Sequence, residues 1–230
     1  MIYGLETIVT FFLAIVSFFV VLASQMYLTS TYKNSKNKKN SKNLTGCEVA
    51  RQILDSNNLE DIYVVEVAGE LSDHYDPSRK VVRLSKEVFH GDSIASLSIA
   101  AHECGHALQD KDDYTLMRIR STLVPFVNFV TYLGYFGLIV SLFAGVIGYL
   151  KLSIGILIVV LLFQLLTLPI EFDASRRALK EIEKLSLVEK KEKEMTVTML
   201  RAAAMTYVAS LISLVIDLLR LVLMLQDRER

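Results

Sequence analysis

Residues 7–28 read TIVTFFLAIVSFFVVLASQMYL, an apolar run without a single charged side chain. About 20 such residues in a helix are enough to cross the hydrocarbon core of a bilayer. A cleaved signal peptide would have a basic start and a shorter apolar core. Here the run follows Glu6, and no Lys or Arg precedes it. We therefore expect a retained transmembrane helix at this position, and with it a membrane-protein fold.

The composition supports this expectation. Hydrophobic residues make up 52% of the chain, yet 22% of the residues are charged. Such a combination indicates that charges are concentrated in some segments and missing from others. Lys+Arg and Asp+Glu are both 25, so the basic surplus typical of nucleic-acid-binding proteins is missing. The two cysteines, Cys47 and Cys104, form no disulfide framework, which favours a reducing compartment.

Three further apolar runs follow. We expect the first two to form a transmembrane hairpin that turns at Gly148, Tyr149 and Lys151, and the third to be a C-terminal apolar helix. The third run contains Asp217 and Arg220, whose i,i+3 spacing allows them to pair on one face. The runs are Leu123–Leu150, Leu152–Ile170 and Ala202–Leu225.

Residues 30–43 read STYKNSKNKKNSKN, which indicates a solvated basic linker. Lysines beside a membrane helix mark the cytoplasmic side and also attract anionic lipid. We therefore expect the N-terminus outside and the following segment in the cytoplasm. A hairpin after that segment returns the chain to the same side. Whether the last apolar helix spans the bilayer stays open.

The segment 45–118 has the pattern of a small α+β domain. Thr45–Asn57 predicts an amphipathic helix, and Ser93–Gln109 predicts a second helix with Asp92 or Ser93 as its N-cap. Ile62–Val67 and Val81–Ser85 predict two strands that pair as a hairpin with a long connection. If Val81–Ser85 is an edge strand, it could bind an extended peptide by strand addition.

The second predicted helix contains His102-Glu103-Cys104-Gly105-His106. Histidines four residues apart lie on one helix face about 6 Å apart along the axis, so both imidazoles can reach one Zn²⁺. Glu103 can then act as general base toward water. Gly105 allows close backbone contact. Cys104 points elsewhere around the helix, and we expect it to be a packed small residue rather than a ligand.

A catalytic zinc site needs a third protein ligand and an open position. The sequence offers several candidates, and spacing alone does not choose between Glu171 as a ligand and Glu171 as an ordinary carboxylate at a membrane boundary. Pro169 fits a helix start or a kink just before it. The candidates are His74, His90, Asp110, Glu171 and Asp173.

Three motifs together resemble the YugP-like family of membrane neutral zinc metallopeptidases: AAHECGHALQD, GELSDHYDPSRKVVRLS upstream and LPIEFDASRRAL downstream. The resemblance covers nearly the whole chain. It implies His102, His106 and Glu171 as ligands of one zinc ion and Glu103 as general base. The chain is more distantly similar to HtpX and CAAX-type proteases, which usually read E-x-x-A-D. Here Ser175 stands at the place of that Asp, which puts a supporting role of Asp173 in doubt.

Four more residues are candidates for contact with substrate or transition state. Arg176 and Arg177 could stabilise an oxyanion, although membrane-surface arginines are common. His74 and Tyr75 could line the cleft or simply belong to a surface turn.

We thus expect a mainly α fold in which membrane helices carry a small α+β, zincin-like cytoplasmic domain with a short β-hairpin and an HExxH helix. The expected function is a membrane zinc metalloendopeptidase that acts on peptides or membrane proteins, with lipid but no nucleic acid as a partner. A non-proteolytic adaptor with a structural zinc, closed by a fourth ligand, is the alternative, and a transporter is a weaker one. The expected parts are a transmembrane helix 1–29, a basic linker 30–44, an HExxH domain 45–118, a transmembrane hairpin 119–170, a charged helical segment 171–201 and an apolar helix with tail 202–230.

Overall fold

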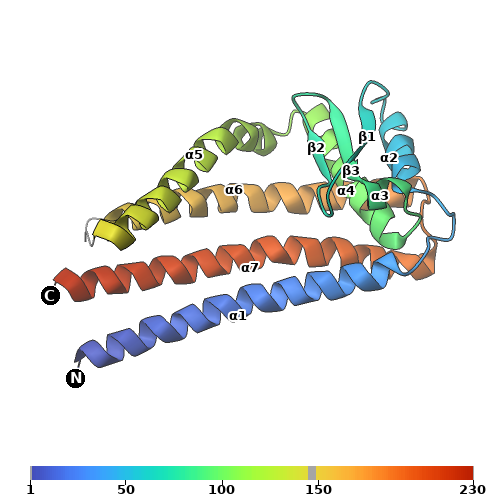
Figure 1. The fold of residues 1–230 in the computed structure, drawn as a ribbon. Coiled ribbons are helices and arrows are strands. Elements are labelled where there is room, and N and C mark those ends of the chain that lie inside the picture. The colour runs from blue at the N-terminus through green and yellow to red at the C-terminus, as the bar shows by residue number, and fades with distance from the viewer. Residues whose placement is uncertain (1, 145–148, 230) are drawn as a thin grey trace. The chain divides into compact units, whose positions relative to one another are not determined.

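The computed structural model describes residues 2–144 and 149–229, and these form two compact units (Figure 1). The apolar unit comprises residues 1–25, 119–168 and 206–230, and the mixed unit comprises residues 26–118 and 169–205. Four long helices contribute to both units. They are α1 (Ile2–Lys36), α5 (Thr115–Ala144), α6 (Tyr149–Lys184) and α7 (Lys190–Glu229).

Among the described residues, 3 helices are long and apolar enough to cross a membrane: Ile8–Lys36, Leu150–Lys184 and Lys190–Gln226. Only 6%, 11% and 6% of their most apolar windows are buried within the protein. Side chains such as Phe11 and Phe18 are accordingly exposed, as expected of a helix surface that contacts lipid. Three predicted apolar runs are thus confirmed as membrane-capable. The fourth, Leu123–Leu150, includes residues 145–148, which lie outside the described ranges, as does Gly148 of the predicted turn.

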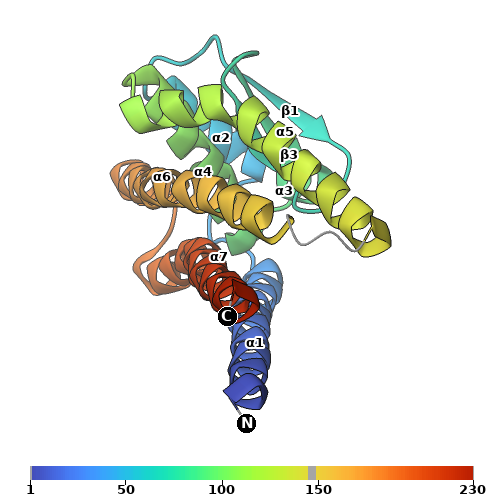
Figure 2. The same cartoon turned by 90° about the vertical axis from the view of Figure 1, so that its left-hand side faces the viewer.

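Within the apolar unit, α1 and α7 run side by side in both views (Figures 1 and 2). The predicted pairing of Asp217 with Arg220 is confirmed, with Nη1 of Arg220 2.7 Å from Oδ1 of Asp217. Ser17 of α1 lies 2.6 Å from Ser213 of α7, measured between their hydroxyl oxygens. Arg220 Nε also donates to the Thr10 carbonyl of α1 at 3.1 Å. Polar groups of these two helices therefore satisfy one another.

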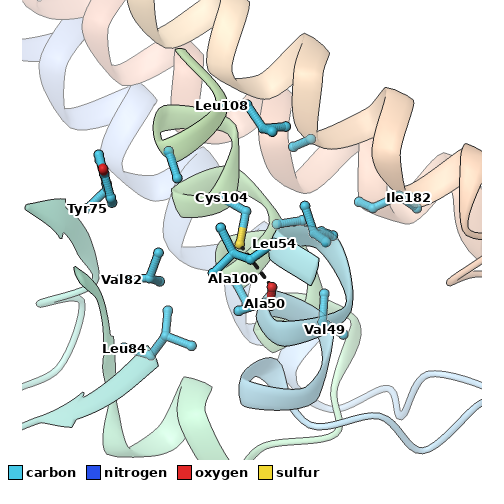
Figure 3. Packing of buried hydrophobic residues seen from close by; sticks show 14 of the residues in the cluster. Val49, Ala50, Leu54, Tyr75, Val82, Leu84, Ala100, Cys104, Leu108 and Ile182 are labelled. Atoms are coloured by element: carbon cyan, nitrogen blue, oxygen red, sulfur yellow. Dashed lines mark hydrogen bonds between the residues drawn. The ribbon is translucent and has the colours of Figure 1, made fainter. Parts of the chain in front are cut away.

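The mixed unit has a core between two helices and a sheet (Figure 3). Helix α2 (Gly46–Asp55) begins with a capping box in which Thr45 and Glu48 bond each other's backbone N–H. Helix α4 (Ile94–Lys111) begins at the N-cap Ser93, whose side chain accepts from the Ser96 N–H. The predicted apolar face of α2 is fully buried, since Val49, Ile53 and Leu54 are 0% exposed. Both predicted helices are confirmed.

The two longer strands pair with each other, as predicted, but the prediction that they form a hairpin was wrong. Strand β1 (Tyr63–Val67) lies parallel to β3 (Val81–Ser85), not antiparallel. The connection between them contains a third strand, β2 (His74–Asp76), which pairs antiparallel with β3 and so forms the hairpin. Its three residues are too few to show an alternating pattern in the sequence. Because the strand order is β1-β3-β2, β3 is central, so the condition for adding a peptide strand at β3 is not met.

Two helix boundaries also differ from expectation. Helix α1 continues to Lys36 into the stretch with linker composition, and Asn40 beyond it is only 1% exposed. Helix α6 runs through Pro169, so Glu171 lies inside a long helix rather than at the start of one. Helix α6 ends later, at Lys184, and α7 begins at Lys190. A short helix, α3 (Lys86–His90), connects β3 to the loop before α4.

Candidate metal centre

Helix α4 presents two histidines from successive turns on one face. The ring centroids of His102 and His106 are 4.9 Å apart, and the rings are nearly perpendicular at 83°. Most of the rest of α4 is buried, including Ala100, Ala101 and Cys104, all at 0% exposure. The surrounding core therefore determines which face of α4 carries the two imidazoles.

A close approach of α6 to α4 completes the cluster. A Cβ atom added at Gly105 would lie 2.3 Å from the Ala174 carbonyl oxygen, so only glycine fits at this crossing. The small residues Ala174 and Ala178 of α6 are fully buried. This confirms the expectation that Gly105 permits close backbone contact. As a consequence, Glu171, one turn before Ala174 on α6, reaches the histidines.

Among the described residues, the candidate ligands that gather are His102, His106 and Glu171, whose ligand atoms all lie within 4.8 Å of one another. Oε2 of Glu171 is 3.3 Å from Nε2 of His102 and 3.6 Å from Nε2 of His106. The Glu171 carboxylate is almost fully buried at 4% side-chain exposure, while His102 retains 17%. Two imidazoles and one carboxylate form a donor set that zinc accepts at a catalytic site with an open position. The residues present thus fit a zinc ion.

Glu103 lies beside the cluster on the same turn of α4. Glu103 is 8% exposed, and its negative charge contributes to raising the pKa of His106.

The electrostatics of His106 follow from its neighbours. Burial by itself lowers the pKa of His106, but the hydrogen bond to Glu171 and the charges of Glu171 and Glu103 outweigh burial and raise it above its ordinary value. A cation is therefore favoured at this point.

The far ring nitrogens of both histidines have polar partners. Nδ1 of His102 is 3.2 Å from the hydroxyl of Ser175, the residue that stands where related motifs carry Asp. Nδ1 of His106 is 3.0 Å from Oε1 of Gln109. Gln109 was not among the residues singled out from the sequence, although its i+3 spacing from His106 on a helix could have indicated it.

Asp173 and Arg177 are linked to His106 through Gln109 and do not themselves bond the histidine. Asp173 Oδ2 accepts from Gln109 Nε2 at 3.0 Å and from Arg177 Nε at 2.6 Å. Arg177 also donates to Asp112 and to the Leu108 carbonyl at the end of α4. Arg177 therefore joins α6 to the C-terminal turn of α4, where a cation is favourable.

The other candidates are engaged elsewhere. Nδ1 of His74 is 2.7 Å from the Ser72 carbonyl oxygen, and His90 pairs with Glu66 at 2.7 Å. Arg176 is exposed on α6.

Tyr75 and Cys104 belong to the core (Figure 3). Tyr75 donates to Asp110 at 2.6 Å, and burial together with this bond raises the pKa of Tyr75. Cys104 points at the Ala50 carbonyl, at 3.6 Å, and burial raises the pKa of its thiol. Over the described ranges, no fourth imidazole, thiol or carboxylate joins the three-residue cluster, and a closed structural site would need one.

Comparison with known proteins adds independent information. The profile of a family described as "Putative neutral zinc metallopeptidase" matches residues 10–226. A protein of Bacillus subtilis (strain 168) described as "Putative membrane protease YugP" is 38% identical over 212 residues, which is 92% of this chain and 94% of that protein. No solved structure matches the chain.

Proposed function

The chain belongs to this family of neutral zinc metallopeptidases, and from that premise we propose that it is a membrane-embedded metalloendopeptidase with Glu103 as its general base. It is a multi-pass membrane protein, with 3 membrane-capable helices among its described residues. The observation that carries the finer proposal is the convergence of His102, His106 and Glu171 beside Glu103. These three residues would hold the zinc ion.

A bound zinc ion supplies a Lewis acid that polarises a carbonyl group and makes water a stronger nucleophile. The remaining work belongs to side chains of the protein. Glu103 takes a proton from the attacking water and returns it to the leaving amine, so that the peptide bond is hydrolysed. The burial of Glu103 and Glu171 limits competition from bulk water for these proton transfers.

The substrate is a peptide segment close to the membrane, and the reaction takes place on the cytoplasmic side. Two features support this. Glu171 follows the apolar stretch of α6 by only a few residues, so one ligand is held on a membrane-capable helix. The lysines near the end of α1 mark the cytoplasmic side: Lys33, Lys36, Lys38, Lys39 and Lys42.

Glu103→Gln tests the proposal, because it removes the base and leaves the three ligands in place. Purified protein in detergent micelles is expected to keep one zinc ion per chain and to lose cleavage of β-casein, followed by mass spectrometry. Glu60→Gln, the same change at an exposed position, serves as control and should retain both properties. Full cleavage by the Glu103 variant would overturn the assignment of the base.

A further inference from the structure

Gln109 is a completely buried polar residue of α4 that the proposed mechanism does not use. Its side-chain amide has three partners. Oε1 lies 3.0 Å from Nδ1 of His106, while Nε2 donates to the Ile170 carbonyl at 2.8 Å and to Asp173 Oδ2 at 3.0 Å. The amide thus bridges a histidine of α4 and two groups of α6.

The partners allow the Gln109 amide only one orientation. A backbone carbonyl and a carboxylate can only accept hydrogen bonds, so the NH2 group of Gln109 must face Ile170 and Asp173. The reversed amide would place an oxygen against two acceptors in a buried location, which is costly. Oε1 must therefore face His106.

This orientation determines which nitrogen of His106 carries hydrogen. Because Oε1 of Gln109 can only accept, Nδ1 of His106 must be the donor. The ring lone pair available to a metal is then at Nε2, the atom that lies toward Glu171. Fixing a ligand histidine in this way selects its tautomer and ring orientation.

The same residue also holds the helix that carries the third ligand. The Ile170 carbonyl belongs to the residue directly before Glu171, and Asp173 is itself held by Arg177. His102 differs, because its Nδ1 faces the Ser175 hydroxyl, which can either donate or accept. A fixed tautomer is therefore imposed on one of the two histidines only.

We propose that Gln109 is a positioning residue that sets the Nδ1–H form of His106 and aligns it with Glu171 for metal binding. The proposal rests on the proposed function, because it concerns the same three ligands. It adds a residue whose chemistry is neither metal ligation nor proton transfer.

Substitutions at Gln109 and Asp173 test whether Gln109 positions His106 for metal binding. Gln109→Glu places a carboxylate against Asp173, so it should weaken zinc binding about tenfold or more, the range found when such partners are removed. In the double variant Gln109→Glu with Asp173→Asn, the amide and the carboxylate change places. The new amide at position 173 can then donate to the new carboxylate at position 109, which still accepts from His106, while the Ile170 carbonyl loses its donor. Because the repulsion between two carboxylates is removed and the Ile170 bond is not rebuilt, zinc affinity at pH 8, measured with a competing chelator on the full chain in micelles, should recover in part, by about threefold or more over Gln109→Glu alone.

The controls separate positioning from folding. Gln52→Glu makes the same change on the exposed side of α2 and should leave zinc affinity unchanged. Two results would overturn the proposal: a Gln109→Glu variant that binds zinc like the Gln52→Glu control, or a double variant that binds no better than Gln109→Glu alone.

The hydrogen position can be observed directly. Protein labelled with ¹⁵N-histidine should show a protonated Nδ1 of His106 with and without zinc, whereas an unprotonated Nδ1 would refute the inference. Replacing His74, His90 and His102 individually assigns their signals, and the signal that remains in every variant belongs to His106. If the unaltered protein takes up no zinc at all, the proposed function fails, while the spectrum of the metal-free protein, recorded at a pH at which the His106 ring is neutral, still decides the role of Gln109.

Discussion

Two helix pairs in this protein bring charged groups together, and they neutralise these charges differently. In the apolar unit, Asp217 has its own cation, Arg220, three residues further along α7. In the mixed unit, Glu171 faces His102 and His106, both of which are neutral when they bind a metal. In the first arrangement the two opposite charges neutralise each other without a metal ion, which indicates a structural role. The second brings a buried carboxylate and two imidazoles to one point, which favours a metal cation between them.

The largest expected effect is at Glu171. Glu171→Gln keeps the size of the side chain but removes its charge, so zinc affinity should fall about 100-fold or more. This loss is larger than the one typical of removing a group that only hydrogen-bonds a metal ligand. Glu183→Gln on the exposed side of the same helix is the control and should bind zinc normally. Measurement with a chelating dye gives both affinities. Equal affinity in the two variants would remove Glu171 from the ligand set.

The crossing of α4 and α6 provides the next test. Gly105→Ala forces a Cβ atom against the Ala174 carbonyl and should lower the free energy of unfolding by about 1–3 kcal/mol, the cost of overpacking. Zinc affinity should fall with it. At Gly155 of α6, an added Cβ meets nothing within 4 Å, so Gly155→Ala should be neutral or stabilise by up to about 1 kcal/mol. Thermal unfolding in micelles compares the two, and opposite signs are expected.

A smaller effect is expected at the ion pair of Asp217 and Arg220. Removing one partner, as in Asp217→Ala, should destabilise by about 1–2 kcal/mol, as for polar contacts between membrane helices. The double variant with Arg220→Ala should be less destabilised than the two single variants added together. Zinc affinity should not change in any of them. Loss of zinc on breaking this pair would show that the two helix pairs are coupled.

The smallest effect concerns Tyr75. Tyr75→Phe removes the bond to Asp110 and should lower the free energy of unfolding by about 0.5–1.5 kcal/mol. Cleavage of β-casein should be unaffected, because the hydroxyl is engaged in the core. A drop in cleavage without a drop in stability would return Tyr75 to the list of substrate contacts.

Local features were predictable from the sequence. The amphipathic helix that begins after Thr45, the N-cap at Ser93 and the apolar runs each depend on residues a few positions apart. The spacing of His102 and His106 belongs to this class as well, since four residues make about one helical turn. Asp217 and Arg220 pair for the same reason.

Contacts between distant segments were not predictable in the same way. The parallel pairing of β1 with β3 depended on a three-residue strand without a recognisable pattern. Gln109 contacts Ile170 across 61 positions of the chain, and no local pattern reports such a contact. Arg177 was expected as an oxyanion candidate, whereas the fold joins it to Asp173 and Asp112.

The sequence by itself therefore determined that the chain has membrane-capable helices and a two-histidine motif with an adjacent carboxylate. These properties follow from hydrophobicity and helical periodicity, which act within one segment. The spacing of residues left Glu171 open and the family resemblance implied it, but the tertiary structure brought Glu171 to the histidines and showed that Gln109 faces His106. The physical reason is the contact of Gly105 with Ala174, because without a side chain at that point two helices can approach closely enough to share one buried polar cluster.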